Sequence, residues 1–248
     1  MRVPHTGQPL LQTLPLQIAE HLCARIIEGK DPPGGRLREV ELAASFDFSR
    51  ATVREALRLL EQRGLVRILP QRGAHVTQLS AKELDDLFEV RASLLATGSR
   101  LVAERCTDSM AGSLRLMLER LRQSAGDVNA YAPVSAELVH MIVHMSGNEV
   151  LANYSDDFAL RIGRYARMGL AAPARRRRSV AMWSRLVAAI AQRDGPAAAQ
   201  LHSQLALENR TAALEEFRKT MLGGLSPAPI QPEGPTGPRS PEYMTWHQ

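Results

Sequence analysis

The sequence predicts a mainly α-helical protein with two parts: three helices and a β-hairpin first, then an all-helical bundle. Three observations lead to this fold class. Apolar residues recur at helical spacing over most of residues 15–222, β-prone runs occur only at residues 65–69 and 74–77, and Pro and Gly clusters separate the segments. The 248 residues, of which 44% are hydrophobic and 23% charged, suit one large or two small globular domains.

Start and stop signals place the N-terminal elements. Pro15 and Gly29 bracket a first helix, and a short second helix occupies about residues 38–46. Ser49 is a good N-cap for a third helix. A turn at residues 70–73 then joins the two strands, so the expected order is helix, helix, helix, strand, strand.

The second part of the chain is expected to contain about six helices. Ser80 and Glu83 form a capping-box pattern at the start of the first of them. The later helices are expected at about residues 108–125, 133–146, 149–171, 175–193 and 195–222. The predicted units are therefore a flexible start at 1–10, domains at 11–78 and 79–222, and a disordered tail, rich in Pro and Gly, at 223–248.

Composition excludes several classes of protein. No apolar run approaches the length of a membrane span, and the N-terminus lacks the pattern of a secretion signal, so a cytoplasmic protein without membrane contact is expected. Cys23 and Cys106 match no metal or redox spacing and are expected to be reduced core residues. The net charge of +5 is compatible with nucleic acid as a partner but does not locate a site.

The third predicted helix carries a basic stripe. Arg50, Arg54 and Arg58 recur every four residues and therefore share one face. The planar guanidinium group matches both phosphate oxygens and the paired acceptors of guanine. The alternative for such a stripe, taken alone, is the solvated face of an ordinary amphipathic helix.

The neighbouring motifs favour the first interpretation. The run Ser-Arg-x-x-Val-Arg-Glu-Ala-Leu at 49–57, with residues 37–43, 60–66 and 72–76, resembles the winged helix-turn-helix of the GntR family of bacterial transcription regulators. The resemblance covers about residues 14–78. It implies that the third helix enters the major groove of DNA and that the hairpin, or wing, enters the minor groove.

The resemblance also implies individual DNA contacts. Arg50 and Arg54 are expected to read base edges, while Ser49 and Thr52 set the register through phosphates. Glu55 is expected to be structural and to pair near Arg58 or the wing, because an acid facing DNA would oppose the phosphates. The remaining expected contacts are the wing-tip residues Arg72 and Gly73, and Arg36 and Arg38 in front of the second helix.

The helical half resembles the FCD effector domain of the FadR subfamily. The marks are Leu-x-x-Val-Arg at 87–91, Met-Ser-Gly-Asn-x-x-Leu at 145–151 and a looser pattern at 186–198. The resemblance implies a small-molecule effector, commonly a carboxylic acid, and a homodimer that binds an inverted-repeat operator.

The expected metal ligands of that family are missing here. Many FCD domains bind a divalent metal through one Asp and three His, and the corresponding positions hold Ser135, Val139, Trp183 and Leu205. We therefore expect no metal cofactor and a pocket in which Val139, Trp183 and Leu205 offer apolar surface to a less polar effector. The alternative is a divalent metal held by the shifted ligands His140, His144 and His202.

Arginines and acids suggest further possibilities for the pocket. An acidic effector would need a cation inside the bundle, for which Arg91, Arg161 and Arg164 are candidates. The arginine run at 175–178 is expected in a solvated loop. A rival of another class is a metal-dependent enzyme using Glu137, His140 and His144, but the spacing lacks the arrangement that places a general base beside a metal.

Together these patterns predict a sequence-specific DNA-binding transcription regulator, a repressor rather than an enzyme. Its partners are expected to be double-stranded operator DNA, a small-molecule effector, and a second copy of the chain. The effector is expected to act by preferring one geometry of the bundle and so changing the spacing of the two winged helices.

Overall fold

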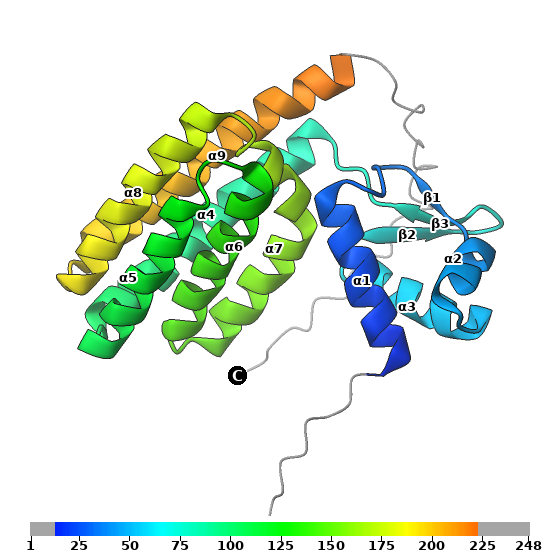
Figure 1. Cartoon of the computed structure of the whole chain (residues 1–248), viewed down its shortest axis with the longest axis horizontal. Coiled ribbons are helices and arrows are strands. Elements are labelled where there is room, and N and C mark those ends of the chain that lie inside the picture. The colour runs from blue at the N-terminus through cyan, green and yellow to red at the C-terminus, as the bar shows by residue number, and fades with distance from the viewer. Residues whose placement is uncertain (1–12, 223–248) are drawn as a thin grey trace, which may run out of the picture.

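The computed structural model describes residues 13–222. The predicted flexible start at 1–10 and the predicted disordered tail at 223–248 lie outside the described residues. An N-terminal domain, from α1 to β3, is followed by a helical domain, from α4 to α9, and the two pack side by side (Figure 1). The fold is mainly α, as the sequence predicts.

The N-terminal domain consists of three helices and a small sheet. Its elements are α1 (Leu14–Glu28), β1 (Arg36–Leu37), α2 (Glu39–Phe46), α3 (Arg50–Gln62), β2 (Val66–Leu69) and β3 (Gly73–Val76). The prediction of a two-stranded hairpin was incomplete, because β1 pairs antiparallel with β3 and the strand order is β1-β3-β2. A strand of two residues is too short to show the alternation that identifies strands in a sequence.

The apolar face of α3 holds this domain together. Ser49 caps the helix, since its hydroxyl oxygen accepts a hydrogen bond from the backbone N–H of Thr52. The buried face packs into one core with α1, α2 and the sheet, and Cys23 is buried in the same core. The opposite face of α3, which carries the arginines, is left to solvent. The buried residues of α3 are Val53, Ala56, Leu57 and Leu60.

The helical domain has the predicted six helices. They are α4 (Ala81–Glu104), α5 (Asp108–Gln123), α6 (Val128–Met145), α7 (Glu149–Met168), α8 (Pro173–Ala191) and α9 (Gly195–Leu222). The capping box at the start of α4 is present in both directions between Ser80 and Glu83. Helix α6 begins at Val128 rather than at 133, because Asp127 caps it and Pro133 lies inside the helix instead of opening it.

The arginine run at 175–178 lies in α8, so its placement in a solvated loop was wrong. Arg175 and Arg176 are only 4% and 3% exposed. The guanidinium of Arg176 donates hydrogen bonds to four backbone carbonyl oxygens that follow the ends of α5 and α7. Carbonyls at helix ends lack partners within their own helix, and a buried arginine satisfies them here. The four acceptors belong to Ala125, Gly126, Leu170 and Ala171.

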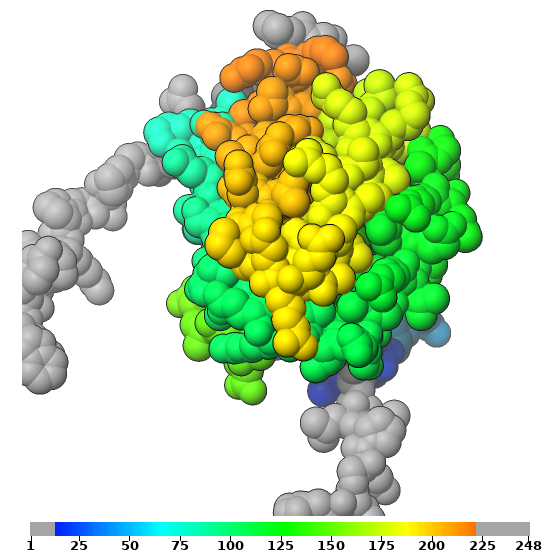
Figure 2. All heavy atoms as spheres, turned by 90° about the vertical axis from the view of Figure 1, so that its left-hand side faces the viewer, coloured from blue at the N-terminus to red at the C-terminus, as the bar shows by residue number. Residues whose placement is uncertain are grey.

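Two packing relations position the sites. Helices α4 and α9 run side by side along the helical domain, and α7 is the helix of this domain that lies next to α1 (Figure 1). At that contact Gly163 of α7 packs against Ile27, since a Cβ added to the glycine would lie 3.4 Å from the Ile27 side chain. Figure 2 shows the side of the bundle turned away from the N-terminal domain, where α8 and α9 (yellow to orange) are neighbours.

Within residues 13–222, none of the helices combines the length and the apolar character that crossing a membrane requires.

Candidate nucleic-acid interface and ligand cavity

The basic stripe of α3 is exposed and is organised by an acid from α2. The side chains of Arg50 and Arg54 are 63% and 50% exposed. Arg54 donates from Nε and Nη2 to the two carboxylate oxygens of Glu39, at 3.0 and 2.7 Å. Nη2 of Arg50 lies 3.9 Å from the same carboxylate. Glu39 thus holds the Arg54 fork in one plane and brings Arg50 near it.

Glu39 was missed by the sequence analysis. The hydrogen bond from Arg54 lowers the pKa of the Glu39 carboxyl, so this acid stays ionised near neutral pH. An acid at the first position of α2 also suits the positive end of the helix dipole. The one available signal was its place in the first turn of α2, which does not show that it reaches α3.

The other predicted contacts around α3 have partners of their own. The hydroxyl groups of Ser49 and Thr52 lie 2.8 Å apart and take part in the cap of the helix. Arg38 precedes α2 and pairs with Glu41 at 2.8 Å.

Glu55 lies 3.6 Å from the guanidinium of Arg58, which agrees with the structural role expected for it.

The wing brings Arg36 and Arg72 to one tip. The turn between β2 and β3 needs positive φ angles at Gln71 (59°) and Gly73 (83°), which explains a glycine there. Arg72 is exposed in this turn. Arg36, on β1, lies beside Gly73, with its guanidinium 3.7 Å from where a Cβ would stand. The structure therefore brings Arg36, which was predicted as a contact in front of the second helix, to the two predicted wing-tip residues, because β1 pairs with β3.

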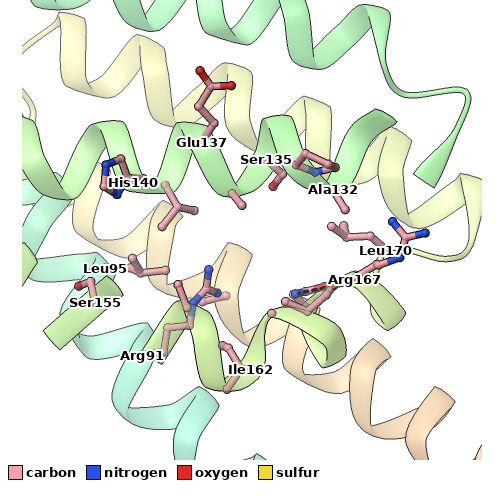
Figure 3. A pocket seen from close by; sticks show the side chains of 18 of the residues that line it. Arg91, Leu95, Ala132, Ser135, Glu137, His140, Ser155, Ile162, Arg167 and Leu170 are labelled. Atoms are coloured by element: carbon pink, nitrogen blue, oxygen red, sulfur yellow. Dashed lines mark hydrogen bonds between the residues drawn. The ribbon is translucent and has the colours of Figure 1, made fainter. Parts of the chain in front are cut away.

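A cavity of about 620 Å³ lies inside the helical domain (Figure 3). Residues of α1 also line it. Four of the predicted pocket residues line it: Arg91, Val139, Trp183 and Leu205. Arg161, the fifth, does not line this cavity. It lies against Gly64 in a small crevice between the domains, and Arg164 lines the same crevice.

Arg91 is one of three arginines that line the cavity, together with Arg167 and Arg175. It projects from α4 into the space below α6 (Figure 3). Burial lowers the pKa of its guanidinium to about 10, so it remains charged at neutral pH. No carboxylate or hydrogen-bond acceptor of residues 13–222 is paired with it. A buried positive charge without a counter-charge is costly, and an anionic ligand would remove that cost.

His202 lies next to this cation and is held neutral. Its Nδ1 is 2.6 Å from the Ser99 hydroxyl, and its ring packs edge-on against Trp183 at 5.2 Å. Burial, together with the positive charge of Arg91, lowers the pKa of the imidazole to about 3. Its Nε2 has no hydrogen-bond partner among the described residues.

Further polar atoms without partners gather around the same cavity. Buried groups in native proteins are nearly always hydrogen-bonded, so these atoms have room for a hydrogen bond to water or to a ligand. Most of these polar residues cannot be identified from the sequence, because single polar residues on apolar helices carry no distinctive pattern. Among the described residues, the buried atoms at the cavity without a hydrogen bond are Ser155 Oγ, Arg175 Nε and Nη1, Trp183 Nε1, His202 Nε2 and Asn209 Oδ1. Of these, Arg175 Nη1 lies 3.7 Å from the Glu208 carboxylate.

The N-terminal domain supplies part of the cavity wall. Ala24, Ile27 and Glu28 of α1 all line it, opposite residues of α4 and α9. A molecule in the cavity would therefore contact both domains.

The cavity does not offer a metal site at the positions that the family uses. Ser135, Val139, Trp183 and Leu205 all line it, but they provide one hydroxyl, two aliphatic side chains and an indole. Such a set cannot supply the nitrogen and carboxylate ligands that a divalent metal needs.

Two of the three fallback ligands do come together, at the rim of the cavity, which His140 also lines. Nδ1 of His140 and Nε2 of His144 each lie 2.9 Å from an oxygen of Asp156, on α7. His202 is not part of this cluster, since it is buried at Ser99. Glu137, the proposed partner of the two histidines in an enzyme, is paired with Arg120 at 3.2 Å instead.

Comparisons with known proteins agree with this architecture. Residues 14–76 match the model described as "Bacterial regulatory proteins, gntR family", and residues 86–208 match that of the FCD domain. The chain is 36% identical over 138 residues to the Nta operon transcriptional regulator of Aminobacter aminovorans, covering 54% of this chain and 64% of that protein.

It is also 34% identical over 109 residues to the uncharacterized HTH-type transcriptional regulator YdhC of Bacillus subtilis (strain 168), covering 44% and 49% of the two chains. The matched part thus spans about half to two thirds of these relatives. The structure of E. coli McbR/YncC shares the fold, with a TM-score of 0.74 and 24% identity over 84% of this chain and all of that one.

Proposed function

Because the chain belongs to the GntR family of bacterial regulatory proteins and carries an FCD domain, we propose that it is a DNA-binding transcription repressor controlled by a small organic acid. It acts as a binding protein and not as an enzyme. The observation that supports DNA binding most strongly is the exposed pair Arg50 and Arg54, oriented by Glu39 at the edge of α3.

In the proposed complex α3 lies in the major groove. Arg54 and Arg50 contact guanine edges, since a fixed guanidinium fork matches the paired acceptors of that base. Ser49 and Thr52 approach phosphates from the start of the helix, and there the helix dipole also attracts an anion. The wing tip follows into the minor groove. Its basic residues are Arg36 and Arg72.

A homodimer is part of the proposal. Two copies related by a two-fold axis would present two α3 helices to the two halves of an inverted-repeat operator. A dimer that occupies such a site in a promoter excludes the polymerase, which is the basis for proposing repression.

The cavity is proposed to bind the effector without a metal. Its volume of about 620 Å³ is typical of small-molecule sites. Arg91 would pair with a carboxylate, and the apolar side chains of Val139, Trp183 and Leu205 would contact the hydrocarbon part. Because Ile27 of α1 lines the same space, a ligand there would bear directly on the position of the N-terminal domain.

The DNA-binding proposal is tested with Arg50→Ala and Arg54→Ala. Genomic fragments selected by the wild-type protein serve as probes, and binding is measured over a range of salt concentrations. Each variant should lose roughly 1–3 kcal/mol of discrimination for its fragment over random DNA. Arg177→Ala, which removes an exposed arginine of α8, is the matched control. Equal discrimination by all four proteins would refute the assignment.

The effector proposal is tested by thermal shift with aliphatic and aromatic monocarboxylic acids and their uncharged amides. At least one acid should raise the melting temperature of the wild type, and its amide should not. Arg91→Met should abolish the response to the acid while the variant still folds. Amides that stabilise the protein as well as acids would show that the cavity does not select for a negative charge.

A further inference from the structure

A cluster of three side chains lies where α6 meets α7, at the rim of the cavity: His140 and Asp156 also line the cavity, whereas His144 does not. We propose that His140, His144 and Asp156 form a binding site for a transition-metal ion of the zinc type. The site uses no residue that the fold family assigns to a metal, and the proposal does not depend on DNA or effector binding.

The three donors already converge on one point. His140 and His144 are one turn apart on α6, and their ring centroids are 3.9 Å apart. Asp156 reaches them from α7, and each of its oxygens lies 2.9 Å from one imidazole nitrogen. The three potential ligand atoms all lie within 4.8 Å of one another. An ion between them would need only small side-chain movements.

Nothing else in the described chain neutralises Asp156. Over residues 13–222, the ion-pair partners of this carboxylate are the two histidines, and no Lys or Arg is within salt-bridge distance. A divalent cation would supply the charge that the carboxylate lacks.

The donor set indicates the type of ion. Two imidazoles and one carboxylate suit Zn²⁺, Co²⁺ and Ni²⁺, whereas Mg²⁺ and Ca²⁺ prefer all-oxygen sites. Histidines four residues apart on a helix can bind one ion from the same face. The three side chains are 58%, 45% and 39% exposed, so water can complete the coordination. In each imidazole, the nitrogen that now faces Asp156 would bind the metal through its lone pair. The other nitrogen of that ring would carry the proton.

The site is distinct from the interior of the cavity. Val139, at the position of the family's histidine, is buried in the cavity wall, while the next residue, His140, is turned around the helix to the rim. An ion at this rim would tie α6 to α7. Helix α7 also carries Gly163, which packs on α1. The ion would therefore stiffen the helix through which the helical domain contacts α1.

The experiment measures metal binding by full-length protein without an affinity tag. Zn²⁺ is titrated calorimetrically, and Co²⁺ is followed by its visible absorption. The wild type should bind one ion per chain, and His144→Ala and Asp156→Asn should each weaken binding at least about tenfold. His21→Ala removes an exposed histidine of α1 and should bind as the wild type does.

Four results would overturn the proposal. The first is a wild type that binds neither ion. The second is unchanged affinity in both His144→Ala and Asp156→Asn. The third is an equal loss in His21→Ala, which would show that scattered surface histidines bind the ion. His202→Gln separates the rim from the cavity, since it should leave Zn²⁺ affinity unchanged; a loss there would place the ion in the cavity.

Discussion

Acidification should destabilise this protein through one buried imidazole, that of His202. The side chain is 1% exposed, and burial beside Arg91 lowers its pKa to about 3. In the unfolded chain the same group has an ordinary pKa of about 6.5. Below that pH the unfolded state binds a proton that the folded state refuses, so stability must fall as the pH falls.

The size of the effect follows from the difference in bound protons. Each pH unit below about 6.5 removes about 1.4 kcal/mol until the folded-state pKa is reached. At pH 4.5 the loss caused by this group is therefore about 2.7 kcal/mol relative to alkaline pH. That is a large part of the net stability of a typical domain.

Urea unfolding at about pH 8 and about pH 4.5 measures this loss in the wild type, His202→Gln and His21→Gln. The wild type and His21→Gln should lose the same free energy of unfolding, and His202→Gln should lose about 2.7 kcal/mol less. The reasoning is refuted if His202→Gln retains the full pH dependence, or if NMR shows the His202 ring titrating near its ordinary pKa.

Three further tests of the packing measure the urea midpoint of five variants. Gly163→Ala should stabilise the folded protein by about 0.5–1 kcal/mol, because the added methyl group meets ordinary contact distances inside a helix. Gly169→Ala should instead cost at least about 2 kcal/mol, since its Cβ would lie 2.7 Å from a backbone oxygen of α9. Equal effects of the two variants would contradict this prediction. Arg176→Ala should cost at least about 3 kcal/mol of stability, because four buried carbonyls lose their donor. Arg177→Ala, which changes the next residue, an exposed arginine, should cost almost nothing. Similar costs for the two variants would show that the burial of Arg176 is unimportant. Ser49→Ala should cost about 1 kcal/mol through the lost cap of α3, and an unchanged midpoint would show that water replaces the hydroxyl.

The face of α3 could be predicted from the sequence because it depends on one helix alone. Arg50, Arg54 and Arg58 share a side by spacing, and the buried residues between them settle which side faces solvent. Glu39 could not be found in this way. Its contact with Arg54 joins residues 15 apart, and it depends on the crossing of α2 over α3, which no local pattern records.

The helical domain shows the same contrast between features that one helix determines and features that depend on the packing of several helices. A run of four arginines is typical of a solvated surface, and only the packing of α8 against the ends of α5 and α7 shows that Arg176 has carbonyls to satisfy. Arg91 and Arg161 were equal candidates for the cavity, because each lies on an amphipathic helix. The rotation of those helices in the bundle decides between them, placing one in the cavity and the other at the domain contact.

The wall that α1 contributes to the cavity has a thermodynamic consequence. Ala24, Ile27 and Glu28 complete the cavity only while the N-terminal domain is docked, so the affinity of any cavity ligand includes the free energy of docking. If operator DNA holds the N-terminal domain in another position, DNA must lower the affinity of the protein for the ligand. The ligand must then lower the affinity of the protein for DNA by the same factor. A ligand titration with and without DNA would then measure the strength of regulation without any assay of transcription.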